Sequence, residues 1–138
     1  NGYSLVVGGD AEAVERLRIA TNHLKGKGYR NIAIVSHSMG SRMSHAFMAQ
    51  NPGDTKAWAA LGLGGKRNYA GIKAPVLDLY GAHDLPVVLS TAKQRSASLK
   101  GNVSGKQVVV PDTDHFFAGK EDAMVKAVTD FLDGLGLK

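Results

Sequence analysis

Three polar residues, Ser38, Asp84 and His115, could together carry out nucleophilic catalysis. A serine hydroxyl is a weak nucleophile near neutral pH, so it needs a base to accept its proton and a carboxylate to orient that base. Ser38 lies in Ser36-His-Ser-Met-Gly40, which follows an apolar, β-branched run and precedes a helix-like stretch. That layout is typical of a nucleophile elbow, with Ser38 at the apex of a tight strand-to-helix turn.

The elbow departs from the usual G-x-S-x-G pattern at one position, because Ser36 replaces the first glycine. Small residues are needed on both sides of the apex, where the backbone bends sharply, and serine is still small. Ser36 itself is expected on the strand and is the weaker candidate for the nucleophile. His37 is adjacent to Ser38, and adjacent side chains diverge at an elbow, so we assign His37 to packing or to tuning of polarity.

An acid and a base follow at later strand ends. Asp84 comes just after the predicted strand Pro75–Tyr80, and His115 comes just after the predicted strand Gln107–Val110. The order Ser38, Asp84, His115 is a known nucleophile–acid–base order. The competing carboxylates are Asp78, expected to satisfy backbone or a neighbouring loop from within its strand, and Asp112 and Asp114, expected to shape the histidine loop.

The elements that must position these residues alternate between strand and helix. The expected strands are Tyr3–Val7, Ile32–Val35, Ala57–Leu63, Pro75–Tyr80 and Gln107–Val110. The expected helices begin with one from Asp10, as N-cap, to Gly26, and continue with Ser41–Gln50, Val87–Leu99 and Glu121–Leu135. Short continuous apolar strands between amphipathic helices predict an α/β domain whose parallel sheet is covered on both faces. Ligands in such sheets bind at the carboxyl ends of the strands, where Ser38, Asp84 and His115 fall.

These segments together resemble the C-terminal half of an α/β-hydrolase of the serine esterase or lipase type. The resemblance rests on the elbow, on Ala74–Asp84, on Asp114-His-Phe116 and on the closing helix, and it extends from about Asp10 onward. It implies a truncated three-layer α/β/α fold with a short, mostly parallel sheet of about four to five strands. It also implies that Ser38, Asp84 and His115 are nucleophile, acid and base, and that the Met39 backbone N–H stabilises the oxyanion.

Two departures from the family limit what the resemblance implies. The family has several strands before the helix that precedes the elbow, and a loop after one of them gives the second oxyanion donor. Here only nine residues precede the first helix. The second oxyanion donor could therefore come from the Gly8-Gly9 turn, or from a second subunit or a separate N-terminal piece. The third alternative is that this donor is missing and the protein is a weak catalyst. The stretch Gly64–Ala74 is too short for a cap domain, which predicts an open, shallow site.

Length and composition limit the kinds of protein that the chain could be. The 138 residues are about one domain by length, so we expect one domain over residues 1–138. There are no cysteines, which excludes disulfides and leaves the compartment open between cytoplasm and periplasm. The net charge is +5, but the basic residues, Arg95 among them, are scattered and predict a solvated surface rather than nucleic-acid binding. We also expect no metal, no cofactor and no membrane span.

The sequence therefore predicts a serine hydrolase, most simply a carboxylesterase that cleaves short-chain acyl esters through an acyl-enzyme. The alternative is a weakly active or non-catalytic fragment of a hydrolase fold that assembles with another chain. The missing strands predict an exposed sheet edge, which favours pairing with a second copy or with an N-terminal segment. Thioesterase and peptidase activity stay open.

Overall fold

The computed structural model describes residues 9–137 and contains a sheet of four parallel strands. The strands are β1 (Ala33–His37), β2 (Ala57–Leu61), β3 (Val76–Gly81) and β4 (Lys106–Val110). The helices are α2 (Asp10–Gly26), α3 (Met39–Gln50), α4 (Pro86–Leu89), α5 (Ala92–Ser98) and α6 (Glu121–Gly134), with a 3-10 turn η1 (Leu99–Gly101) after α5. The expected α/β class and parallel sheet are confirmed, whereas the expected strand Tyr3–Val7 lies outside the described residues.

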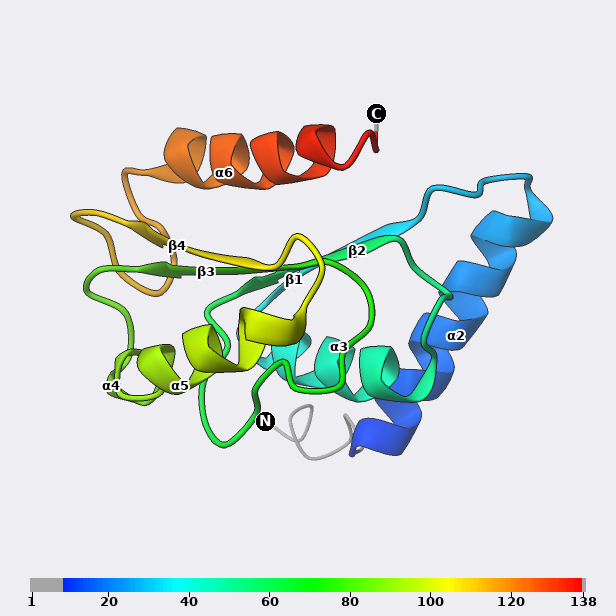
Figure 1. Ribbon diagram of the computed structural model, residues 1–138, viewed down its shortest axis with the longest axis horizontal. Helices are drawn as coiled ribbons and strands as arrows, with labels where there is room; N and C mark the ends of the chain where they lie inside the picture. Colours follow the sequence, from blue (N-terminus) through cyan, green and yellow to red (C-terminus); the bar gives the residue numbers. More distant parts are fainter. Residues whose placement is uncertain (1–8, 138) are drawn as a thin grey trace, which may run out of the picture.

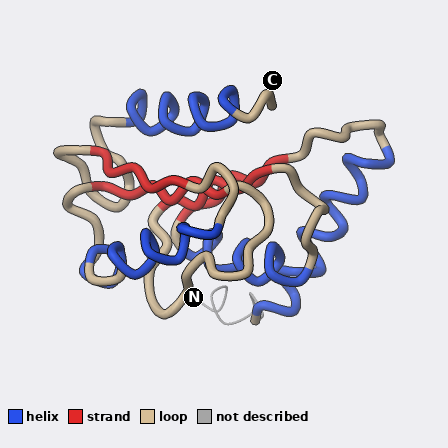
Figure 2. Tube along the Cα trace, in the orientation of Figure 1, coloured by secondary structure: helices blue, strands red, loops and turns tan. Residues whose placement is uncertain are grey.

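The sheet forms the middle of three layers (Figure 1). Helix α6 lies on one face, and helices α3, α4 and α5 lie on the other, with α2 packed beside α3. Figure 2 shows the strands as a single layer between these two sets of helices. The strands occupy the order β1-β2-β3-β4, so each new strand is added next to the one before it in the chain.

Strand β2 contributes apolar side chains to the core on both faces of the sheet. All five of its residues are buried, which is why this stretch is apolar without alternation. One face of β2 carries Trp58 and Ala60, which pack with Phe47 of α3. The other face, which α6 covers, carries Ala57, Ala59 and Leu61. The core is therefore two apolar layers separated by the sheet.

Strand β1 is less covered than its sequence suggested. Val35 lies opposite Ala59 in the parallel register, so its side chain is on the face that carries α6. It is nevertheless 52% exposed, because the described helices leave this face open over β1. The prediction of a strand buried on both faces is wrong at Val35.

The single helix expected over Val87–Leu99 is divided into α4, α5 and η1. Two side chains donate to carbonyl groups of α4. The Thr91 hydroxyl donates to the Val87 carbonyl at 2.8 Å, and the Arg95 guanidinium donates to the Val88 carbonyl at 2.8 Å.

Arg95 differs from expectation. It is completely buried rather than part of a solvated surface, and its Nε lies 3.0 Å from the Asp78 carboxylate. Asp78 contacts a neighbouring loop, as expected, because it accepts a hydrogen bond from the hydroxyl of Tyr69 in the loop after β2, and it also accepts one from the Gln107 amide. Burial, together with the neighbouring Asp78, raises the pKa of Tyr69 well above its ordinary value, so the phenol keeps its proton and donates. This network joins β3, β4 and α5.

Asp10 does not cap α2 as the sequence suggested. Gly9 is the N-cap, and Asp10 is the first helical residue. The Asp10 carboxylate instead lies 2.6 Å from the Arg67 guanidinium, in the loop after β2. This ion pair ties the start of α2 to the carboxyl end of the sheet.

Candidate active site

Ser38 occupies the turn between β1 and α3 in a conformation that L-residues rarely adopt, with φ 55° and ψ −119°. Such strained backbone persists only where the surrounding structure enforces it, and strand-to-helix elbows are one such place. Here the Ser38 N–H donates to the Leu61 carbonyl of the neighbouring strand at 2.8 Å. The elbow is therefore anchored to β2.

The replacement of glycine by Ser36 has a structural reason. The Ser36 hydroxyl oxygen accepts a hydrogen bond of 2.9 Å from the indole N–H of Trp58, which is fully buried and needs a partner. A Cβ placed on Gly40 would lie 3.8 Å from the Cβ of Ser36, so the two flanking positions do face each other. Small size is required at both, and the hydroxyl at Ser36 adds a bond that glycine could not make.

The structure brings Ser38, His115 and Asp84 together. His115 Nε2 lies 2.8 Å from the Ser38 hydroxyl oxygen, and His115 Nδ1 lies 2.6 Å from the Asp84 carboxylate. A carboxylate can only accept, so Nδ1 carries the proton and Nε2 is left free to accept from Ser38. The side chains of His115 and Asp84 are 6% and 0% exposed, so water competes little for their hydrogen bond.

Backbone groups fix the Asp84 carboxylate. One oxygen accepts from the Leu85 N–H at 2.7 Å, and the other accepts from the Gly81 N–H at 3.2 Å. With the His115 imidazole, these donors orient both oxygens. These three hydrogen bonds hold the Asp84 carboxylate against His115 Nδ1.

His115 reaches Ser38 by crossing the ends of two strands. Its loop leaves β4, at one edge of the sheet, and must pass β3 and β2 to meet the residue after β1. A Cβ on Gly62, just after β2, would lie 2.8 Å from the imidazole, and a Cβ on Gly81, at the end of β3, would lie 2.4 Å from the Asp114 carbonyl oxygen. The two glycines therefore clear the path of the histidine loop.

His37 has a role that the sequence did not reveal. Its Nε2–H donates to the backbone carbonyl of His115 at 2.7 Å, and the two imidazole rings lie 4.7 Å apart. The expectation that side chains diverge at the elbow holds in the sense that His37 points away from the Ser38 hydroxyl. Its partner, however, is the loop that carries the base, so His37 holds that loop in place.

The remaining candidates lie apart from these hydrogen bonds. Asp114 accepts from the backbone N–H groups of Phe116 and Ala118 and so shapes the histidine loop, as expected. Asp112 has a positive φ of 53° in the same loop. His83, next to Asp84 in the chain, is exposed and does not line the cavity beside Ser38.

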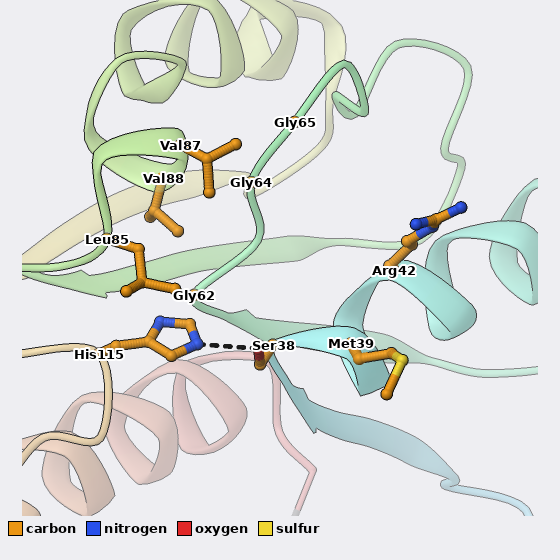
Figure 3. Close-up of a pocket in the computed structure, with 10 residues that line it drawn as sticks. All are labelled: Ser38, Met39, Arg42, Gly62, Gly64, Gly65, Leu85, Val87, Val88 and His115. Atoms are coloured by element: carbon orange, nitrogen blue, oxygen red, sulfur yellow. Dashed lines mark hydrogen bonds between the residues drawn. The ribbon is translucent and has the colours of Figure 1, made fainter. Parts of the chain in front are cut away.

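A cavity of about 310 Å³ opens beside Ser38 and His115. Leu85, Val87 and Val88 line it from the segment around α4, and Met39 and Arg42 line it from α3, as the close-up in Figure 3 shows. The connection from β2 to β3 contains no helix or strand and forms no cap. The site is therefore open and small, with one apolar wall.

The backbone N–H of Met39 is the oxyanion donor expected from the sequence. Met39 is the first residue of α3, where N–H groups have no carbonyl one turn earlier, and its N–H has no hydrogen-bond partner within residues 9–137. The Gly8-Gly9 turn was one expected source of the second oxyanion donor, and Gly8 lies outside the described residues. The described structure therefore leaves the Met39 N–H, next to Ser38, without a partner.

Two further findings concern the described part of the chain. Within residues 9–137, no cluster of three or more His, Cys, Asp or Glu side chains is arranged to hold a metal ion. No helix in that range combines the length and the apolarity that crossing a membrane requires.

Comparison with known proteins shows the fold. No family model matches the chain, and no curated protein sequence matches it. Among solved structures, a cold-adapted esterase from an Arctic intertidal metagenomic library matches with a TM-score of 0.77 and 22% identity, covering 95% of this chain and 61% of that one. An alpha-beta serine hydrolase homologue from Coxiella burnetii matches with a TM-score of 0.74 and 17% identity, covering 91% of this chain and 61% of that one.

The chain thus spans about three fifths of the length of these two proteins. The match covers 91–95% of this chain, while part of each neighbour has no counterpart here. The chain therefore has a partial α/β-hydrolase fold.

Proposed function

We propose that the protein is a serine hydrolase, and specifically a carboxylesterase that cleaves small acyl esters. The observation that carries the proposal is the hydrogen-bonded series Ser38–His115–Asp84, with distances of 2.8 and 2.6 Å. Hydrogen bonding of a serine to an imidazole that is itself oriented by a carboxylate is the arrangement that activates a serine hydroxyl. The fold shared with an esterase and with a serine hydrolase homologue supports the same reaction class.

The proposed reaction has two stages. The Ser38 oxygen attacks the ester carbonyl while His115 Nε2 takes the hydroxyl proton, and the Asp84 carboxylate stabilises the imidazolium that forms. The Met39 N–H donates to the oxyanion of the tetrahedral intermediate. His115 then returns the proton to the leaving alcohol, which leaves an acyl group on Ser38. Water, deprotonated by His115, attacks this acyl-enzyme, releases the carboxylic acid and restores the serine.

The shape of the site favours small substrates. A volume of about 310 Å³ is near the lower end of the range for small-molecule pockets. The apolar wall of Leu85, Val87 and Val88 fits a short acyl chain or a small alcohol group. Because the β2–β3 connection places no cap over the cavity, a longer acyl chain would extend beyond the described walls and gain little binding energy.

The test is Ser38→Ala, assayed with a short-chain nitrophenyl ester. Loss of the attacking oxygen is expected to lower kcat/KM by about 10⁴-fold or more, as in other triad enzymes. The control is Ser90→Ala, which removes an exposed serine hydroxyl outside the cavity and should leave turnover unchanged. A fluorophosphonate probe should label Ser38 alone, and full turnover by Ser38→Ala would overturn the proposal.

A second candidate is a weakly active or non-catalytic unit that assembles with another chain. It is supported by β1, which is an outer strand of the described sheet and carries the exposed Val35. Outer strands with unpaired backbone groups favour pairing, and a two-fold symmetric pair of β1 strands would form a homodimer. Turnover by a strictly monomeric preparation at the rate of the bulk enzyme would contradict this candidate.

A further inference from the structure

Arg42 lines the cavity beside Ser38, and its positive charge forms no ion pair among the described residues. It lies one helical turn after Ser38 on α3, and its side chain is exposed. Within residues 9–137, its guanidinium makes no hydrogen bond or ion pair, while its backbone N–H donates to the Ser38 carbonyl. The sequence Asn1–Gly8 contains no Asp or Glu, so no carboxylate side chain can come from there.

The surroundings of Arg42 add positive charge. A neighbouring hollow of about 360 Å³ shares Arg42 with the cavity and is also lined by Lys66 and Arg67. The charge of Arg67 is already paired, because its guanidinium lies 2.6 Å from the Asp10 carboxylate. The same guanidinium lies 3.3 Å from His45 Nδ1. Its hydrogen bond lowers the pKa of Asp10, and the nearby charge of Arg42 acts in the same direction. The carboxylate of Asp10 thus balances Arg67, and the charges of Arg42 and Lys66 remain.

The cavity therefore has two unlike sides, as Figure 3 shows. Leu85, Val87 and Val88 form the apolar side, and the Arg42 guanidinium extends from α3 on the other side of Ser38. A substrate bound with its ester carbonyl at Ser38 would place one end against aliphatic side chains. The opposite end would meet a cation that forms no direct ion pair among the described residues, since the nearby Asp10 carboxylate is bound to Arg67.

We propose that the substrates are esters that carry a negatively charged group, and that Arg42, assisted by Lys66, is the specificity residue that binds this group. The inference rests on the proposed serine hydrolase function and adds the substrate class. A guanidinium presents several N–H donors in a planar fork, which suits a carboxylate or a phosphate. An exposed charge next to the nucleophile discriminates between substrates without taking part in bond breaking.

The experiment compares two nitrophenyl esters that differ only at the end of the acyl chain. One is the 4-nitrophenyl ester of valeric acid, and the other is the mono-4-nitrophenyl ester of glutaric acid, in which a carboxylate replaces the terminal methyl group. The measured quantity is the ratio of kcat/KM for the charged ester to that for the neutral ester. A second pair, 4-methylphenyl acetate and 4-acetoxybenzoate, places the carboxylate on the alcohol side instead.

In the wild-type protein this ratio should exceed one for at least one pair, and in Arg42→Gln it should fall by about tenfold, the usual size of a charged hydrogen bond in rate terms. Arg42→Lys should recover part of the ratio, and Lys66→Gln should lower it less than Arg42→Gln does. The matched control is Arg30→Gln, which removes an exposed arginine at the opposite end of the sheet and should leave the ratio unchanged. High salt should lower the wild-type ratio but not that of Arg42→Gln, because exposed charges are screened.

The outcomes separate the two proposals. Ser38-dependent hydrolysis of both esters with the same ratio in wild type and Arg42→Gln would overturn the charged-substrate inference and leave the hydrolase function standing. Absence of Ser38-dependent hydrolysis of every ester would overturn the function, and the inference with it. A ratio that falls only for the acyl pair or only for the alcohol pair supports the inference and identifies the side of the ester that carries the charge.

Discussion

Gly62 gives the His115 imidazole the space to reach Ser38. Replacing it with alanine would put a methyl group 2.8 Å from His115 Cε1, and the residue has φ 62°. The positive φ alone costs about 1–2 kcal/mol of stability for a residue with a side chain. The imidazole would also have to move, and a displacement of about 1 Å at a catalytic group costs about 10²-fold in rate. We expect Gly62→Ala to lower kcat/KM by about that factor.

Gly71→Ala separates these two effects. Gly71 also has a positive φ, of 80°, but nothing lies within 4 Å of the added Cβ. It should therefore lose a similar amount of stability, measured by urea unfolding, with kcat/KM unchanged for the folded protein. Equal losses of activity in the two variants would mean that backbone strain, and not the collision with His115, is responsible.

His37 is expected to act as a positioning residue through the His115 carbonyl. His37→Ala should lower kcat by about tenfold or more, because the loop that carries the base loses the 2.7 Å bond that fixes it. His37→Gln should recover part of the activity, since the glutamine amide can donate to the same carbonyl. The exposed His23 provides the control, and His23→Ala should have no effect. Failure of glutamine to recover more than alanine would contradict the positioning role.

At the scale of elements, the buried pair Asp78–Arg95 joins β3 to α5. Arg95→Met would leave the Asp78 charge buried without its cation, which typically costs about 3–5 kcal/mol. The free energy of unfolding, from urea denaturation, should fall by that amount. Arg18→Met is the control, because the Arg18–Glu15 pair is exposed and such pairs contribute about 0–1 kcal/mol. A loss below about 1 kcal/mol for Arg95→Met would show that Asp78 does not depend on this partner.

Most elements could be predicted from the sequence, because the strands are continuous apolar runs and the helices have one apolar face. The break between α4 and α5 was not predicted, and neither was the burial of Arg95, whose guanidinium donates to the Val88 carbonyl. Arg95 lies at helical spacing from the buried Ala92 and Leu99, but a long cation is rarely buried, so its residue type places it at the surface. Only its spatial partner Asp78, 17 residues earlier, reveals its place.

The site was predictable to a similar degree. Ser38, Asp84 and His115 stand at strand ends, and parallel topology brings strand ends together. The bond from His37 to the His115 carbonyl could not be found, because a backbone acceptor leaves no mark in the sequence. Gly62 and Gly81, in contrast, can be recognised in the sequence, because each is a glycine directly at a strand end before a loop. A glycine at such a position indicates that another chain segment approaches closely.

At the scale of the whole molecule, the open strand β1 is expected to govern association. If two copies pair along β1, Val35→Lys should weaken the dimer, because it places a charge on the exposed apolar surface beside the paired edge. Sedimentation velocity at several protein concentrations would measure the shift toward monomer. Val103→Lys is the matched control, since Val103 is also exposed, at 74%, but lies in the loop before β4. A wild-type protein that stays monomeric at all concentrations would contradict the homodimer.

The passage of the histidine loop over Gly81 and Gly62 has a consequence for biosynthesis. Ser38 follows the first described strand and His115 follows the last, so 77 residues separate the nucleophile from its base. A nascent chain that has emerged only as far as Gly81 contains the residues of β1, β2 and the elbow but lacks His115. The hydrogen bond between Ser38 and His115 can therefore form only after the final loop has emerged and crossed the sheet.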